Sequence, residues 1–385
     1  MIKIAFLTPE YPHPKTGNSG GIGSSIKNLA AGLIAQNCRV LVLVYGQNQD
    51  AIFDDDGVEI HQIKNVKFKG LSWFLTQKKI EKKINFLYKS DQIDLVEAPD
   101  WTGITSFIKP KCPILIRLHG CDTYFCHLDN RTVKWHNKFL EKRALQKADA
   151  LLSVSGFTAN LTNTVFGLNK KFRVIPNAID TDFFSKNNKN QSTPEPVILY
   201  FGSIIRKKGL LELPHIFNTV FKENPTAKLL LIGRDVPDIM SQNSSTWAMM
   251  EALFDTEAKK SVTFLGAVPY QEIKKHIENA SVCVFPSFAE ALPLSWIEAM
   301  SLQKAIVASN IGWANEMITD GKNGFLENPK SHQAFAEKIN ILLSNPELCS
   351  VFGITARETA VRKFGIKSVS IQNKIFYETV IHSKK

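Results

Sequence analysis

Short apolar runs alternate along this chain with longer stretches in which apolar residues recur every three or four positions. The short runs are rich in Val, Ile and Leu, which is typical of strands buried on both faces. They predict strands at Ile2–Leu7, Val40–Tyr45, Val58–Ile63, Leu95–Glu97, Ile114–Leu118, Ala150–Val154, Arg173–Ile175, Val197–Phe201, Lys228–Ile232, Val262–Leu265, Val282–Phe285 and Ala305–Ala308. The amphipathic stretches predict helices, including Ser24–Gln36, Val133–Lys147, Gly209–Glu223 and Tyr270–Asn279. This alternation predicts an α/β protein whose parallel sheets are covered by helices on both faces.

The chain has 385 residues, which is long for one hydrophobic core, and two domains are expected. A polar, proline-punctuated segment at 185–196 is the predicted linker. It divides a first domain at 1–184 from a second at 197–367, and a helix at about 368–385 is expected to pack back on the first domain. Doubly wound sheets bind ligands beyond the carboxyl ends of their strands, so we expect a ligand in a cleft between two facing domains.

Two loops at predicted strand ends have the composition of anion sites. Gly20 and Gly21 precede the helix at Ser24–Gln36, where glycine lets backbone amides approach an anion; a plain tight turn is the alternative. After the strand Val197–Phe201, Arg206, Lys207 and Lys208 precede a helix that is expected to begin at Gly209. A solvated helix start is the alternative for these cations, but their place at a sheet edge favours binding of a diphosphate.

The most specific pattern is the stretch 285–300. Glu290 lies in a loop after a buried strand, Pro293 suits the first turn of a helix, and Glu298 falls about five residues into that helix. Unpaired amides near Leu294 and Ser295 favour an anion at the start of the helix. Taken singly, Glu290 is equally explained as a helix-capping acid and Glu298 as a surface charge.

Glu290 and Glu298, with seven residues between them, resemble the paired-glutamate signature of the retaining family-four glycosyltransferases of GT-B fold. The resemblance extends in the family's order from residue 1 to about 326. It includes the glycine loop, His119–Asp122, Val174–Asp180, Lys208–Gly209, Lys304–Ser309, Gly312, Glu316 and Asp320–Phe325. It implies the GT-B fold, in which two Rossmann-like, doubly wound domains face each other across an interdomain cleft.

The resemblance also implies roles for matching residues. Glu298 would accept hydrogen bonds from the nucleotide ribose and Glu290 from the donor sugar, Lys208 would bind the diphosphate, and His119 would lie near the reacting centre. The family often has arginine where this chain has Ser203, and Arg206 is expected to supply that charge. Catalytic roles are thus predicted for His119 and Glu290, and donor binding for Gly20, Gly21, Arg206, Lys208, Leu294, Ser295 and Glu298. Acceptor contacts are predicted for Asp100, Trp101 and Tyr124.

The expected activity is transfer of a sugar, with retention of configuration, from a nucleotide-diphosphate sugar to a glycan or lipid-linked glycan acceptor in polysaccharide or glycoconjugate biosynthesis. No cofactor and no metal are expected, because a turn explains Asp54–Asp56 and the second acidic pair, Asp180 and Asp182, leads into the linker. The alternatives are an epimerase or phosphorylase of the same fold, or a non-catalytic partner that binds a sugar nucleotide. A nicotinamide oxidoreductase is disfavoured because no GxGxxG motif is present.

The formal net charge is +11, and segment 61–89 has eight lysines and a single acid, Glu81. No nucleic-acid-binding motif accompanies them, so no nucleic-acid partner is expected. The predicted helix at 72–89 places Trp73, Ile80, Ile84 and Leu87 on one face and Lys78, Lys82 and Lys89 on the other. Such a helix suits peripheral contact with an anionic membrane, while a helix packed on the core with its lysines in water is the alternative. No apolar run is long enough to span a bilayer, and a cytoplasmic protein, at the inner face of the membrane, is expected.

Overall fold

The computed structural model describes residues 1–17, 19–186 and 196–384, and the chain divides into two compact units. Unit 1 comprises Met1–Asp180 and Lys363–Lys385, and unit 2 comprises Thr181–Arg362. The division differs from the expected one, because 181–184 lie with unit 2 and 363–367 with unit 1. The guanidinium of Arg357 accounts for the first difference, since it donates to the carbonyls of Thr181 (2.6 Å) and Phe184 (3.0 Å). Most of the predicted linker, 187–195, lies outside the described residues.

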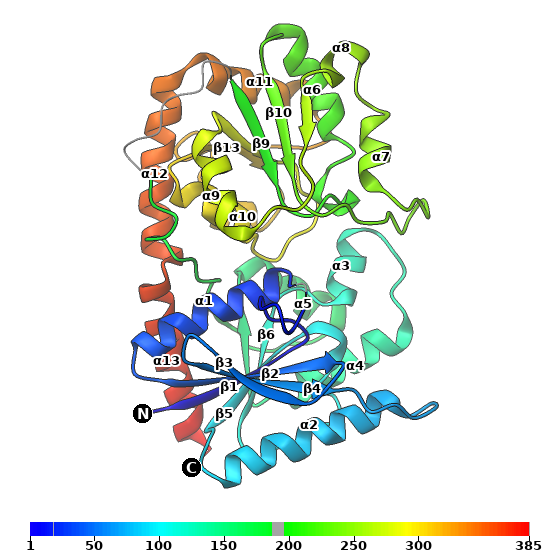
Figure 1. Cartoon of the computed structure of the whole chain (residues 1–385), viewed down its shortest axis with the longest axis vertical. Coiled ribbons are helices and arrows are strands. Elements are labelled where there is room, and N and C mark those ends of the chain that lie inside the picture. Colours follow the sequence, from blue (N-terminus) through cyan, green and yellow to red (C-terminus); the bar gives the residue numbers. More distant parts are fainter. Residues whose placement is uncertain (18, 187–195, 385) are drawn as a thin grey trace. The chain divides into compact units, whose positions relative to one another are not determined.

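Unit 1 is built on an eight-stranded sheet in the order β3-β4-β2-β1-β5-β6-β7-β8 (Figure 1). The strands are β1 (Lys3–Thr8), β2 (Arg39–Gln47), β3 (Ala51–Asp55), β4 (Val58–Lys64), β5 (Leu95–Pro99), β6 (Ile114–Leu118), β7 (Ala150–Ser153) and β8 (Arg173–Val174). All neighbours pair in parallel except β3 and β4. The parallel strands confirm the apolar runs as an α/β sheet.

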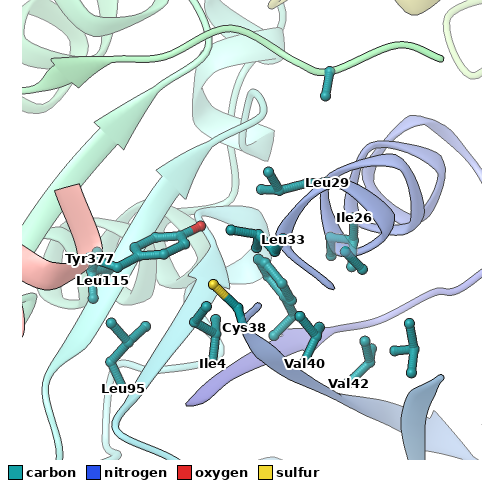
Figure 2. Close-up of a cluster of buried hydrophobic side chains, with 14 of the residues drawn as sticks. Ile4, Ile26, Leu29, Leu33, Cys38, Val40, Val42, Leu95, Leu115 and Tyr377 are labelled. Atoms are coloured by element: carbon teal, nitrogen blue, oxygen red, sulfur yellow. The ribbon is translucent and has the colours of Figure 1, made fainter. Parts of the chain in front are cut away.

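Alternate residues of β1 serve two hydrophobic cores, one on each face of this sheet. Ile4 and Phe6 pack with α1 (Gly21–Ala35) and α13 (Ile366–Ser383), and Figure 2 shows Tyr377 of α13 reaching into this cluster. Ala5 and Leu7 belong to a second cluster, with residues of α2 (Ser72–Lys89). The remaining helices of unit 1 are α3 (Asp122–Leu128), α4 (Trp135–Lys147) and α5 (Gly156–Phe166). Helices therefore cover both faces, as the strand composition predicts.

The apolar side of α2 faces the protein rather than solvent. Ile80, Ile84 and Leu87 are buried in the second cluster, whereas Trp73 is 36% exposed. These three apolar residues therefore pack on the core, as in the alternative interpretation, while contact of 72–89 with an anionic membrane stays a prediction. In the described part of the chain, no helix has the length and apolar character needed to cross a bilayer.

Of the hairpin formed by β3 and β4, the apolar runs predicted β4 and the acidic triplet predicted the turn, but β3 was not predicted. Its turn consists of Asp56 (φ 53°) and Gly57 (φ 81°), and two successive positive φ angles are typical of a tight hairpin turn. The acidic triplet Asp54–Asp56 thus forms the strand end and the turn. The Asp55 carboxylate accepts hydrogen bonds from the Tyr11 hydroxyl and the Lys27 amine, each at 2.8 Å, so it is used within the fold.

Unit 2 has a six-stranded, all-parallel sheet in the order β11-β10-β9-β12-β13-β14 (Figure 1). Its strands are β9 (Val197–Phe201), β10 (Lys228–Ile232), β11 (Val262–Phe264), β12 (Val282–Phe285), β13 (Ala305–Ser309) and β14 (Phe325–Glu327). Its helices are α6 (Leu213–Glu223), α7 (Thr246–Glu251), α8 (Thr256–Lys259), α9 (Tyr270–Asn279), α10 (Leu294–Ser301), α11 (His332–Ser344) and α12 (Pro346–Phe364), the last of which ends in unit 1. Two parallel-sheet units confirm the predicted fold class.

Candidate functional site

The loop after β9 holds Lys208 at the edge of the unit 2 sheet. Arg206–Lys208 form one 3₁₀ turn, which ends at Gly209 with φ 70°, and α6 begins only at Leu213. The prediction that a helix begins at Gly209 is therefore wrong. A Cβ at Gly209 would lie 1.8 Å from the carbonyl oxygen of Pro286, so only glycine lets this loop approach the loop that follows β12.

Glu290 meets Lys208 across these two loops. The Lys208 amine lies 3.0 Å from Glu290 Oε1, and both side chains are largely but not fully buried. The amides of Phe288 and Ala289 donate to the carbonyl of Lys207 at 2.8 and 3.2 Å, which fixes one loop on the other. The structure therefore brings together the cation and the first carboxylate that the sequence singled out.

Glu298 lies nearby on α10, whose first residue is Leu294. It is 5% exposed, and burial raises the pKa of its carboxyl to about 7, although the Tyr270 hydroxyl and the charge of Lys208 lower it. The Tyr270 hydroxyl donates to Glu298 Oε1 at 2.8 Å. Tyr270, the first residue of α9, was not predicted to belong to the site, since no local pattern around it marks the carboxyl that it meets.

The start of α10 also carries the two predicted amide donors. Pro293 precedes the helix, and no side chain caps it. Leu294 and Ser295 are half-buried at its first turn. The positive end of the helix dipole and these amides therefore favour an anion in the vicinity of Lys208 and the two glutamates.

Arg206 was expected to supply positive charge to the diphosphate, but in the structure it pairs with a carboxylate of the same unit. Its guanidinium forms a two-point ion pair with Asp238, with distances of 2.8 and 2.7 Å. This pairing holds the pKa of the Asp238 carboxyl well below its usual range, with help from hydrogen bonds donated by Ser241. Arg206 thus links two loops of unit 2, and its charge is compensated within the fold.

In unit 1, His119 directly follows β6. Its amide donates to Asp100 Oδ1 at 2.9 Å, and burial together with the charge of Arg117 lowers the pKa of its imidazole to about 3. The ring is therefore neutral at pH 7. Asp100 is 2% exposed, burial raises the pKa of its carboxyl to about 7, and its Oδ2 has no partner among the described residues.

The other two predicted acceptor residues lie in different surroundings. Trp101 is half-buried in a 3₁₀ turn at Trp101–Gly103. Tyr124 is fully buried in a hydrophobic cluster under α3 and α5, and its hydroxyl lies 3.4 Å from Thr158 Oγ1. Asp100 and Tyr124 are thus buried and Trp101 is half-buried, and the acceptor contacts of all three residues stay a prediction.

Gly20 and Gly21 are exposed at the start of α1, which begins at Gly21 and not at Ser24 as predicted, and a carboxylate already lies there. Glu10 Oε1 accepts a hydrogen bond from the amide of Gly23 at 3.0 Å, and a Cβ at Gly20 would lie 3.3 Å from both Glu10 carboxylate oxygens. An anion at this helix start would meet that negative charge. Glu10 was missed because nothing in the sequence relates it to a helix that begins eleven residues later.

The chain is similar to known proteins along most of its length. Residues 19–183 match the family described as Glycosyltransferase Family 4, and residues 181–359 match Glycosyl transferases group 1. Alpha-maltose-1-phosphate synthase of Mycolicibacterium smegmatis is 24% identical over 98% of this chain and 100% of its own length. Sucrose-phosphate synthase of Thermosynechococcus elongatus superposes with a TM-score of 0.80, at 19% identity over 99% of this chain and 100% of its own. HepE of Anabaena, solved with UDP and glucose, superposes with a TM-score of 0.75, at 19% identity over 98% of this chain and 100% of its own.

The two family matches follow each other along the chain and together span both units. The structural likeness covers nearly the whole chain and extends to both parallel sheets. This chain is therefore a glycosyltransferase of GT-B fold and belongs to glycosyltransferase family 4.

Proposed function

We propose that this glycosyltransferase moves a sugar from a nucleotide-diphosphate sugar to a glycan or lipid-linked glycan acceptor, with retention of the anomeric configuration and without a metal ion or cofactor. The observation that carries the proposal is the grouping of Lys208, Glu290 and Glu298 beside the uncapped start of α10. One cation, two carboxylates and free helix amides match what a sugar diphosphate offers, namely two phosphates between two sets of hydroxyls.

Each group has a distinct role in the proposed reaction. Glu298 accepts hydrogen bonds from the ribose and Glu290 from the donor sugar, while Lys208 and the amides of Leu294 and Ser295 bind the diphosphate. A nucleotide donor is supported by HepE, whose structures contain UDP, UDP-glucose or UDP with glucose. In unit 1, the neutral imidazole of His119 is suited to a hydrogen bond with the donor sugar rather than to charge stabilisation.

Breaking the bond between C1 of the sugar and the phosphate oxygen leaves both bonding electrons on the diphosphate. Positive charge develops on the sugar ring, and negative charge develops on the leaving oxygen. Lys208 and the α10 amides stabilise that negative charge, which is the largest catalytic contribution expected here. The acceptor hydroxyl attacks C1 from the face that the diphosphate leaves, and its proton passes to the leaving phosphate oxygen. Since Lys208 and the helix start supply the positive charge, the proposal requires no divalent ion.

The proposed setting is polysaccharide or glycoconjugate biosynthesis in the cytoplasm, at the inner face of the membrane. A lipid-linked acceptor would bring the enzyme to that surface. Because the apolar face of α2 is buried, such a contact must use other residues.

Thermal shift against UDP-, GDP- and ADP-sugars, with and without EDTA, identifies the donor. Product analysis by NMR with that donor then distinguishes transfer from isomerisation and gives the anomeric configuration of the new linkage. We expect the sugars of one nucleotide class to raise Tm equally with and without EDTA. We also expect the new glycosidic bond to have the same anomeric configuration as the donor, axial or equatorial. Inversion, isomerised donor, or a requirement for metal would each contradict the corresponding part of the proposal.

A further inference from the structure

Four side chains at intervals of four residues form a stripe along α4: Trp135, Phe139, Arg143 and Lys147. Residues so spaced lie on one side of a helix. Trp135, whose ring meets that of His136 edge to face, is 79% exposed and Phe139 is 51% exposed, so two large aromatic side chains close together present much of their surface to solvent. The single acid of α4, Glu141, is buried and accepts hydrogen bonds from the amides of Asp122 and Thr123. The outer side of α4 is therefore aromatic at one end and cationic at the other.

This stripe continues onto the start of α2 through Phe107. The rings of Phe74 and Phe107 meet edge to face at 5.9 Å, and the Arg143 guanidinium lies 4.8 Å from the centre of the Phe107 ring. The Lys78 amine donates to the carbonyl of Phe107 at 3.0 Å. Two helices distant in sequence thus share one surface, here called the α2–α4 surface, made of Phe74, Lys78, Trp135, Phe139, Arg143 and Lys147.

The cations of this surface are close enough to influence one another. Partial desolvation and the nearby charges of Arg143, Lys109 and Lys78 lower the pKa of Lys147. Glu81 pairs with Lys78 at 2.7 Å and is the one acid among the eight lysines of 61–89. Further exposed apolar side chains, Phe68 and Leu71, precede α2. Positive charge and exposed aromatic surface therefore coincide.

We propose that the α2–α4 surface docks on an anionic lipid bilayer, with Trp135 and Phe139 at the level of the headgroups and the neighbouring cations against lipid phosphates. The indole of Trp135, with its polar N–H, favours the membrane–water interface, the apolar ring of Phe139 favours burial below the headgroups, and basic side chains add attraction to anionic lipid. The inference deepens the proposed function, since it rests on an acceptor presented at a membrane. The membrane-contacting residues it names are exposed, in contrast to the buried apolar residues of α2.

Co-sedimentation of the full chain with vesicles tests the proposal. Vesicles of phosphatidylcholine with phosphatidylglycerol are compared with vesicles of phosphatidylcholine alone, and we expect binding to the anionic vesicles only. Trp135→Ser with Phe139→Ser should lower the partition coefficient by about tenfold or more, from the loss of two exposed aromatic groups. Arg143→Gln with Lys147→Gln, both in the stripe on α4, should lower it by about 25-fold, since each cation near an anionic surface contributes about fivefold.

Matched control variants distinguish binding through this surface from nonspecific adsorption to vesicles. Val351→Ser with Ile354→Ser removes two apolar groups that are 57% and 50% exposed on α12, and Lys259→Gln with Lys260→Gln removes two exposed cations of unit 2. Both controls should bind vesicles as the parent does. Trp135→Phe should keep binding but remove the part of the fluorescence blue shift that Trp135 contributes.

Several outcomes would overturn the docking proposal. These are no binding to anionic vesicles, equal binding to neutral ones, or equal loss in the α4 variants and their controls. Retention of vesicle binding in the α4 variants, with loss of binding to an acidic protein or an oligonucleotide, would assign the surface to that partner instead. Donor-induced thermal shift in the same variants keeps the two proposals apart, because it should persist whether or not the membrane contact is real.

Discussion

Unit 1 and unit 2 each contain a buried carboxylate beside a cation, but the two pairs are built differently. In unit 1, the Arg117 guanidinium donates to both oxygens of Glu97, at 2.6 and 3.0 Å, and the two side chains are 3% and 4% exposed. Arg117 also donates to the carbonyl of Ile175 and to Asn373, and the Tyr377 hydroxyl donates to Glu97 at 2.7 Å. This network is enclosed and hydrogen-bonded on every side.

In unit 2, the Lys208 and Glu290 side chains are 19% and 12% exposed and lie between two loops rather than inside a sheet. Glu298 is 5% exposed, and burial raises the pKa of its carboxyl to about 7, although the Tyr270 hydroxyl and the charge of Lys208 lower it. The comparison teaches that buried charge alone does not indicate function. A pair saturated by its own fold stabilises that fold, whereas a buried carboxyl at a sheet edge whose pKa is raised, such as that of Glu298, is better suited to bind a ligand.

The largest effect is expected from breaking the enclosed pair. Arg117→Ala leaves Glu97 buried without its partner, which costs about 3–5 kcal/mol of folding free energy. Thermal unfolding should show a large loss of Tm for the transition of unit 1. Glu97→Gln with Arg117→Met is the matched control, because removing both charges should recover much of the loss. A single variant as stable as the parent would show that the network contributes little.

Breaking the open pair should instead abolish activity without unfolding the chain. Lys208→Ala removes the cation proposed to stabilise the leaving diphosphate, and kcat should fall by about 100- to 1,000-fold. Tm should change little, since the side chain is partly solvated. Lys222→Ala, on the exposed side of α6, controls for the loss of one charge. Near-normal turnover in Lys208→Ala would contradict the proposed diphosphate role.

Most of the sheet could be predicted because buried parallel strands form continuous apolar runs. The missed strands are those that lack this signature. β3 alternates half-buried and exposed residues at an antiparallel edge, and β14 has only two apolar residues before Glu327. The boundary of unit 1 was displaced because the contacts of Arg357 with Thr181 and Phe184 join residues that are 176 and 173 positions apart.

The site was predictable where one short segment carries it, as in Glu290–Glu298. It was not predictable where a partner comes from elsewhere in the chain. Tyr270 reaches Glu298 across 28 positions, and Asp238 reaches Arg206 across 32. The lysine-rich helix α2 illustrates the same limit, since the pattern shows an apolar face without showing that the core covers it.

A third prediction concerns the pH dependence of stability. The pKa of Glu298 is raised from 4.5 to about 7, so the folded chain binds this proton more tightly than the unfolded chain does. Its contribution to stability is therefore fully present below about pH 4.5 and is lost as the pH rises through about 7, a change on the order of 3 kcal/mol. Glu298→Gln should reduce the fall in Tm between pH 5 and pH 8, while Asp100, whose pKa is also raised to about 7, maintains part of it. An unchanged pH profile would mean that ionisation of Glu298 does not lower the free energy of unfolding.

A smaller effect is expected from Tyr270→Phe. Loss of one hydrogen bond to a charged group costs about 1–2 kcal/mol, so KM for the donor should rise by roughly five- to thirtyfold while kcat changes less. If Tyr270 orients Glu298 toward the ribose, discrimination between the donor and its 2′-deoxy analogue should fall in the same variant. Equal losses for both donors would mean that the hydroxyl stabilises α9 without orienting the carboxyl.

The smallest effect on catalysis is expected from Arg206→Gln, and it decides between two interpretations of the loop after β9. The guanidinium is already paired with Asp238 and is about one-third exposed, so its contribution to the binding of a diphosphate should amount to no more than about 1 kcal/mol, or about fivefold in kcat/KM. Arg206→Gln with Asp238→Asn removes both charges and should restore any lost stability. A loss comparable with that of Lys208→Ala would show instead that Arg206 leaves Asp238 when the donor binds and supplies the charge that Ser203 lacks. The loop would then open on the ligand, and the contrast between saturated and open charge pairs would hold only for the empty enzyme.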